Sequence, residues 1–208
     1  MRLSTTVLAF GLCILSGCGT LSAMTGGPER DVFELRPPAP ATGCGRASIG
    51  ELIIEPPKAR STLDSDRIMI RPSALQTQYL PDAQWGEAVP EMLQRLLVQS
   101  LGATGSFGYV GRAPLGISGD YALISEIEDF NAELTAEGVV VRLTVNAQMV
   151  SELEADIVSR GRFAAAVPAA GTRTADLIPA FDAAARQLVT QMTEWGLRAS
   201  GVNPRQCQ

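Results

Sequence analysis

The sequence has 208 residues, of which 46% are hydrophobic and 19% are charged. This length and composition are typical of one globular domain and exclude a disordered or collagen-like chain. The formal net charge of −5 argues against a nucleic-acid-binding surface, which requires clustered basic side chains.

Residues 1–17 are expected to be a signal peptide. Arg2 supplies one positive charge, and residues 3–15 form a mostly apolar stretch followed by small residues. This stretch is too short to cross roughly 30 Å of hydrocarbon as a transmembrane helix. We therefore predict that residues 1–17 direct export and are then removed.

Leu15-Ser16-Gly17-Cys18 resembles the lipobox of bacterial lipoproteins. The resemblance implies diacylglycerol on the Cys18 thiol, cleavage before Cys18, and an acyl chain such as palmitate on the new amino terminus. Several acyl chains anchor a protein stably, whereas a single chain is marginal. Gly19 stands where an Asp would favour the inner membrane, which implies sorting to the outer membrane. The alternative is an ordinary signal peptide with an incidental cysteine.

The next segment, to residue 30, contains glycine and small polar residues and is expected to be a flexible tether, so that residues 18–30 form a lipidated linker. Twelve such residues have a typical reach on the order of 20 Å. Residues 31–208 are predicted to form one domain.

Cys44 and Cys207 are the thiols that remain once Cys13 is removed and Cys18 is lipidated. Export exposes them to an oxidising compartment, so we predict a disulfide between them. Closing so long a loop would stabilise the fold by roughly 4–5 kcal/mol in the chain-entropy model, if the Cα atoms approach within about 7 Å. Two free thiols are the alternative.

Short strands are predicted in the first part of the domain. Residues 32–36, 51–55 and 67–71 are short runs, mostly rich in β-branched residues and bounded by proline or glycine. Residues 75–80 are a weaker candidate strand.

A helix is predicted from about Glu87 to Ala103, because apolar residues recur there with a helical period. These residues are Val89, Met92, Leu93, Leu96, Leu97 and Leu101. Glycines then recur at every third position: Gly102, Gly105, Gly108 and Gly111. A phosphate-binding loop opens a helix and usually carries a lysine, whereas this run follows a helix and has none. It predicts the end of the helix and a tight connection.

Extended segments follow at residues 107–111, 120–134, 139–151 and 156–167, with a hairpin turn at 135–138. Apolar and polar residues alternate along 139–151, which predicts an antiparallel strand with one buried face. A second amphipathic helix is predicted at residues 176–198. Together these elements predict an α+β fold, a two-layer domain in which two helices cover one face of a mostly antiparallel sheet.

The chain contains no histidine, which excludes the common Ser-His-Asp and Cys-His nucleophilic sites and histidine-ligated metal centres. We therefore predict no catalytic residues, no metal and no cofactor. Glu126, Glu128 and Asp129 raise the question of a glycosidase-like carboxyl pair. Aromatic residues make up only 5% of the chain, so a solvated face is the preferred interpretation. On that face the acids would meet arginines of neighbouring strands: Arg142, Arg160 or Arg162.

Tyr79 and Trp85 flank Pro81-Asp82-Ala83-Gln84, just before the first predicted helix. Large rings of this kind anchor partner contacts. The preferred alternative is that Trp85 packs against the helix that it precedes.

The central part of the chain resembles the ABC-type transport auxiliary lipoproteins, which include the PqiC-like outer-membrane lipoproteins. The resemblance is carried by five runs: Arg67–Pro72, Gln76–Tyr79, Trp85–Pro90, Leu93–Leu97 and Phe107–Val110. It covers roughly residues 31–200. Relatives often begin with paired tyrosines, where this chain has Val32-Phe33-Glu34-Leu35.

The resemblance implies a lipid-anchored subunit on the periplasmic face of the outer membrane. It would bind the periplasmic Mce-domain protein of an ABC transporter that moves lipids between the membranes and supports membrane integrity. The family supplies no catalytic residues. A ring of identical subunits would suit a tubular partner, and this analogy is the only argument for a homo-oligomer. The alternative is a structural or assembly lipoprotein, similar to a pilotin, of another envelope machine.

Overall fold

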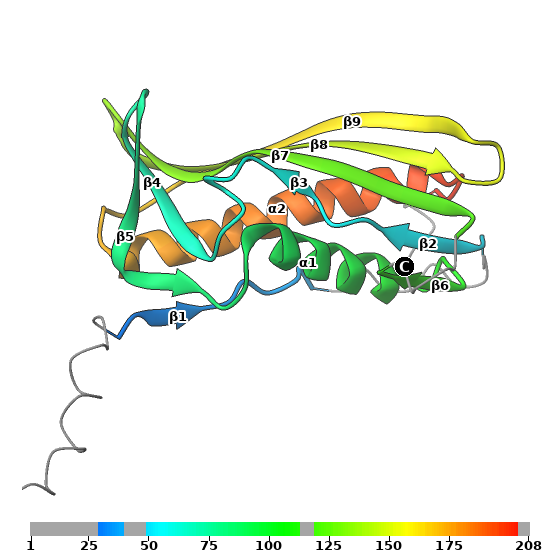
Figure 1. Ribbon diagram of the computed structural model, residues 1–208, viewed down its shortest axis with the longest axis horizontal. Coiled ribbons are helices and arrows are strands. Elements are labelled where there is room, and N and C mark those ends of the chain that lie inside the picture. Colours follow the sequence, from blue (N-terminus) through cyan, green and yellow to red (C-terminus); the bar gives the residue numbers. More distant parts are fainter. Residues whose placement is uncertain (1–28, 40–48, 113–118, 204–208) are drawn as a thin grey trace, which may run out of the picture.

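The computed structural model describes residues 29–39, 49–112 and 119–203. The elements are β1 (Asp31–Phe33), β2 (Glu51–Ile54), β3 (Lys58–Ala59), β4 (Arg67–Ser73), β5 (Gln76–Trp85), α1 (Val89–Ala103), β6 (Tyr109–Gly111), β7 (Tyr121–Thr135), β8 (Gly138–Ser151), β9 (Asp156–Pro168) and α2 (Thr174–Ala199). Figure 1 shows two layers, with the long strands on one side and both helices on the other. The predicted α+β fold is confirmed.

The central strand of the sheet is β7, which pairs with four other strands of the described chain. Along one side, β7 pairs with β8 in antiparallel register over almost its full length. Along the other side it pairs in parallel with β2, then β3, then β4. The strand β9 extends the sheet beyond β8, β5 and β1 extend it beyond β4, and β6 lies next to β2. The strands β7, β8 and β9 therefore form an antiparallel meander that includes the predicted hairpin, and the parallel pairings make the whole sheet mixed.

The alternation predicted for β8 is confirmed. Its inward side chains are all buried: Val139, Val141, Leu143, Val145, Ala147 and Met149. Of the side chains that point the other way, Arg142 and Gln148 are exposed, whereas Asn146 is half-buried and Thr144 is buried. Because successive side chains of a strand face opposite sides, β8 contributes one face to the core and one to solvent.

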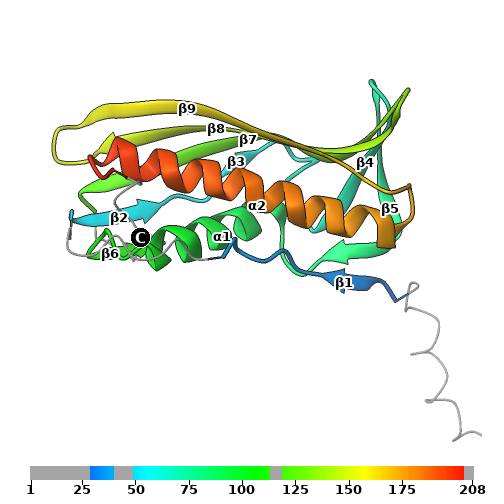
Figure 2. The same cartoon turned by 180° about the vertical axis from the view of Figure 1, so that it is seen from behind.

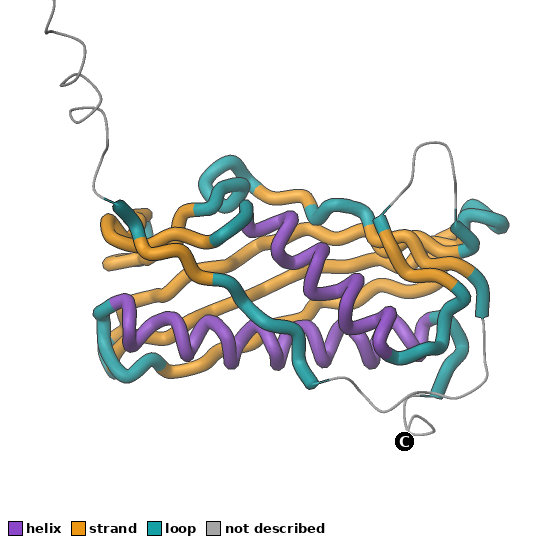
Figure 3. The backbone as a smooth tube through the Cα atoms, turned by 90° about the horizontal axis from the view of Figure 1, so that it is seen from below, coloured by secondary structure: helices purple, strands orange, loops and turns teal. Residues whose placement is uncertain are grey.

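Both helices cross the inner face of the sheet, as the view in Figure 3 shows. Their apolar stripes are buried as the periodicity predicted, and α2 begins two residues earlier than expected. After α1 the chain turns at Gly105, whose φ of +65° suits glycine. The backbone N–H of Gly108 then donates to the carbonyl of Gly50, 2.8 Å away, which leads the chain into β6. The glycine run is thus a connection, as predicted.

Three aromatic rings join the layers near one end of the core. The ring of Trp85 contacts Phe181 at a centroid separation of 5.2 Å and Phe130 at 6.1 Å, and Phe130 and Phe181 are 5.8 Å apart. These residues belong to β5, α2 and β7. Edge-to-face and offset contacts of this kind stabilise a core beyond the area that they bury.

Cys18, Cys44 and Cys207 lie outside the described residues, as do residues 1–17 and most of the tether. The lipid attachment and the disulfide stay predictions. Among the helices that the structure describes, none is both long and apolar enough to cross a membrane.

Candidate functional site

The helices cover one face of the β7–β8–β9 meander, and in the described part of the chain no helix covers the other face (Figures 1 and 2). We call this second face the open face. It is lined by charged and amide side chains, and it is defined by Lys58, Glu126, Glu128, Arg142, Asn146, Gln148, Arg160 and Arg162. Cross-strand partners share a face, which is why these residues gather there.

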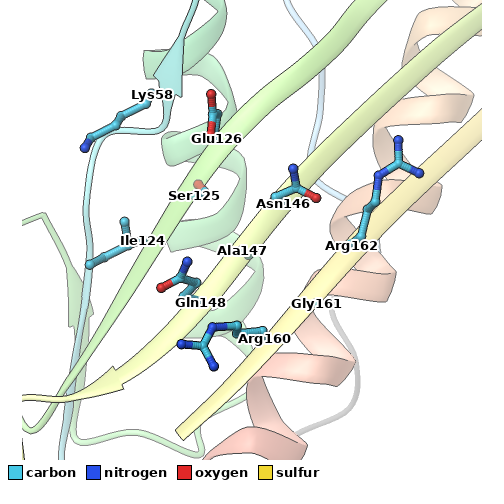
Figure 4. Close-up of a pocket in the computed structure, with 10 residues that line it drawn as sticks. All are labelled: Lys58, Ile124, Ser125, Glu126, Asn146, Ala147, Gln148, Arg160, Gly161 and Arg162. Atoms are coloured by element: carbon cyan, nitrogen blue, oxygen red, sulfur yellow. The ribbon is translucent and has the colours of Figure 1, made fainter. Parts of the chain in front are cut away.

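The open face is hollowed at its centre. A concavity of about 600 Å³ is lined by residues of four strands: Lys58, Ile124, Ser125, Glu126, Asn146, Ala147, Gln148, Arg160, Gly161 and Arg162. Figure 4 shows the side chains of Lys58, Glu126, Gln148 and Arg160 around it. Its floor is formed by β7 and β8, with β3 on one side and β9 on the other.

Glu128 forms the most strongly bonded group on the open face. The Nδ2 of Asn146 donates to Oε1 of Glu128 at 2.6 Å, and the Nε and Nη2 of Arg162 donate to Oε2 at 3.2 and 2.7 Å. The hydrogen bonds from Arg162, followed by the one from Asn146, lower the pKa of Glu128. These contacts stabilise the carboxylate form, which is the opposite of what a general acid needs.

A β-bulge accounts for the position of Glu128. The register of β7 on β8 shifts between Ile127 and Asp129, so that Glu128 is the extra residue. A bulge re-aims the side chain of the inserted residue. Here it brings the carboxylate to the donors of β8 and β9.

The predicted pairing of acids with arginines holds in part. Glu128 meets Arg162, as expected, whereas Asp129 lies 3.7 Å from each of Arg60 and Arg71. Arg142 pairs with Glu133 at 3.1 Å, an acid that the sequence did not single out.

Three charged side chains of the open face are exposed and form no ion pair with the residues that the structure describes: Lys58, Glu126 and Arg160. They surround the concavity with charges of both signs. Within the described ranges, no group of three acidic or cysteine side chains is arranged to hold a metal ion.

Trp85 and Tyr79 lie apart from the open face. Trp85 is 1% exposed, and its ring contacts those of Phe130 and Phe181. Its ring therefore belongs to the core and does not reach the surface. Tyr79 is half-buried: its hydroxyl donates to the carbonyl of Thr62 at 2.9 Å, and the guanidinium of Arg67 lies 4.1 Å from its ring centroid. A contact of Tyr79 with a partner stays a prediction.

The concavity was not predicted from the sequence. It depends on the parallel pairing of β3 with β7, which sets Lys58 beside Glu126, and on the register that sets Arg160 beside Gln148. The alternation of polar residues along β7, β8 and β9 was the available signal, because it identified a wet face without showing its shape.

The model of the family described as "ABC-type transport auxiliary lipoprotein component" matches residues 33–193. No curated protein is similar enough to this chain to count as a match.

The chain is similar to several solved structures, and the first two named here share its fold. Protein XCC0632 from Xanthomonas campestris, assigned to the family DUF330, is 24% identical, with 82% of this chain and 96% of that chain covered and a TM-score of 0.71. An uncharacterized protein is 13% identical, with coverages of 80% and 98% and a TM-score of 0.61. PelC from Paraburkholderia phytofirmans, solved as a dodecamer, is 11% identical, with coverages of 80% and 94% and a TM-score of 0.46. At these identities the likeness concerns the fold alone.

Proposed function

This chain belongs to the ABC-type transport auxiliary lipoprotein family, and from that premise we propose that it is the outer-membrane docking subunit of an Mce-type ABC transporter. Membership makes it a membrane-anchored lipoprotein of the cell envelope that serves transport in an auxiliary, non-catalytic role. The proposal adds the partner, a periplasmic Mce-domain protein, and the cargo class, lipids whose movement supports membrane integrity.

The observation that carries the proposal is the open face. It is a broad polar surface with a concavity of about 600 Å³ and with three charged side chains, Lys58, Glu126 and Arg160, that have no ion partner among the described residues. Mixed charges of this kind give specificity and orientation to a contact between proteins. The opposite face of the sheet is occupied by α1 and α2, so the open face is the sheet surface free to receive a partner.

The anchor completes the proposal. Acyl chains on Cys18 hold the protein at the membrane, and the following residue, Gly19, favours the outer membrane. A tether to residue 30 gives the domain a reach on the order of 20 Å from its attachment. A disulfide between Cys44 and Cys207, if formed on export, would join the segment before β2 to the region after α2.

Affinity purification of the lipoprotein from detergent-solubilised envelopes tests the proposal. We expect a periplasmic Mce-domain protein among the enriched partners, and greater sensitivity to detergents in cells that lack the gene. If the Mce-domain protein is absent while the components of another envelope machine are enriched, the docking role is wrong. The assembly lipoprotein then becomes the better interpretation.

A further inference from the structure

The last residue of the turn between β4 and β5 is apolar and fully exposed to solvent. Leu75 is 100% exposed, and Ala74 beside it is exposed as well. No charged residue occurs from Pro72 to Leu80. One exposed leucine is ordinary on a protein surface. The surroundings of Leu75 are what make it informative.

An apolar pocket of about 120 Å³ opens beside β4 of the same hairpin. Its lining is mainly aliphatic, with Ile70, Pro72, Ala132, Leu134, Val139 and Leu177 among its residues. Leu134, near the end of β7, is 51% exposed. Because β4 runs parallel to β7 with Ile70 opposite Ala132, the β4–β5 hairpin stands beside the β7–β8 turn, as Figures 1 and 2 show. Apolar surface is thus concentrated at this end of the domain.

The described chain also begins at this end. β1 pairs with the far part of β5, with Asp31 opposite Ala83, so the chain enters the domain along an arm of the same hairpin. Figure 1 shows the start of β1 and the tip of the β4–β5 hairpin at one end of the long axis, and the β8–β9 hairpin at the other.

The tether to Cys18 therefore leaves from the end that carries Leu75. Ten residues separate Cys18 from Glu29, and a flexible coil of that length typically spans roughly 16–19 Å. A lipid anchor at Cys18 consequently holds this end of the domain close to the bilayer.

We propose that the tip of the β4–β5 hairpin is a second membrane contact, in which Leu75 enters the leaflet that holds the acyl chains of Cys18. The hairpin tip carries no charge that would have to be desolvated on entry. A single leucine does not hold a protein on a bilayer, but the acyl chains already supply attachment. The tip only has to orient the domain, with its long axis away from the membrane and the open face along its side.

This inference rests on the lipid attachment proposed at Cys18, and it is independent of which transporter the protein serves. The contact is apolar, so it should not require anionic lipid and should persist at high salt. Glu137 in the neighbouring β7–β8 turn is exposed, and it gives the region no attraction to anionic headgroups.

The test uses the full lipidated protein reconstituted into vesicles of phosphatidylethanolamine and phosphatidylglycerol. Leu75→Trp is compared with Leu153→Trp, because Leu153 is an exposed residue (80%) at the tip of the opposite hairpin, β8–β9. The native Trp85 and Trp195 are 1% and 9% exposed, and the wild-type protein supplies their background. Each protein is measured in vesicles with ordinary or with brominated acyl chains, since bromine quenches tryptophan on contact.

We expect the added emission of Leu75→Trp to shift to the blue and to lose most of its intensity in brominated vesicles, at low and at high salt. The emission of Leu153→Trp should not change. Equal emission of Leu75→Trp in both kinds of vesicle, or stronger quenching at position 153, would overturn the inference. So would a shift at position 75 that appears only when the transporter partner is added, because the tip would then contact protein. None of these outcomes affects co-purification with the partner, so the docking proposal is tested separately.

Discussion

The ring of Phe163 lies over Gly161 on the helix side of β9, so closely that a Cβ atom at Gly161 would lie 2.4 Å from Cζ of Phe163. The same ring contacts Trp195 of α2, with centroids 5.3 Å apart. The absence of a side chain at Gly161 thus permits the contact between β9 and α2.

Gly161→Ala is therefore expected to destabilise the fold by about 1–3 kcal/mol, because the new methyl group displaces Phe163 from Trp195. Urea unfolding measures the change. Gly102→Ala is the matched control: Gly102 is exposed near the end of α1, and its Cβ would meet only Val110 at 3.9 Å. There alanine should be neutral or stabilising, by up to about 1 kcal/mol. Equal effects of the two substitutions would contradict the role given to Gly161.

The carboxyl group of Glu128 is expected to titrate below its usual pKa. Hydrogen bonds from Arg162 and Asn146 favour the carboxylate in the folded protein. A folded-state pKa below the unfolded one means that the stabilisation is present above the unfolded pKa and is lost as the pH falls through the folded pKa. Carboxyl-detected NMR titration measures this directly. In Arg162→Gln the pKa should rise towards its usual value, and an unchanged pKa would show that Arg162 is not its main cause.

Reversing the unpaired charges of the open face should weaken docking. For Arg160→Glu combined with Lys58→Glu we expect at least a tenfold loss of affinity for the Mce-domain partner, about 1.4 kcal/mol, with a weaker dependence on salt. Pull-down from envelopes followed by titration with the purified partner gives the number. Arg198→Glu is the control, since Arg198 lies on α2 and is 56% exposed. Loss of binding in the control as well would show that the open face is not the site.

Cys18→Ala should abolish acylation and leave the precursor uncleaved. The reason is that the thiol of Cys18 is the proposed acceptor of diacylglycerol, and cleavage follows its modification. Labelling with a radioactive fatty acid and electrophoretic mobility report the two steps. A variant that is still processed and still fractionates with the outer membrane would contradict the lipobox interpretation.

Cys44 and Cys207 should resist alkylation in protein exported to the periplasm and become reactive after reduction. Mass spectrometry of alkylated peptides, with and without reductant, distinguishes one bridge from two free thiols. Two alkylated cysteines in unreduced protein would exclude the bridge.

Local patterns were sufficient to predict most elements and their buried faces. The alternation along β8 and the apolar stripe of α1 depend on neighbouring residues, so they can be read without knowledge of the fold. The partners of β2, β3 and β4 could not be read, because parallel pairing with β7 joins segments far apart in the chain.

The candidate site shows the same division. The sequence placed Glu126 and Glu128 on a solvated face with neighbouring arginines, but it did not identify Lys58. The contact of Glu128 with Arg162 depends on a bulge that leaves no clear sequence signal. Trp85 is buried in the core, as the packing interpretation expected, but its ring contacts with Phe130 and Phe181 were not predicted. Its packing neighbours were set by the long-range assembly of β5, β7 and α2, which local sequence does not encode.

The helix α2 runs along the long axis of the domain and spans much of its length (Figure 1). Its 26 residues span about 39 Å. Its first residue lies at the end of the domain that the proposed lipid anchor would hold, where the hydroxyl of Thr174 donates to a carboxylate oxygen of Asp82 at 3.1 Å. The β8–β9 hairpin lies at the opposite end of the domain, and α2 runs between the two ends (Figure 1). Under the proposed anchoring, the domain would extend from the membrane by about the length of α2, so a partner that crosses the periplasm would meet it before reaching the lipid surface.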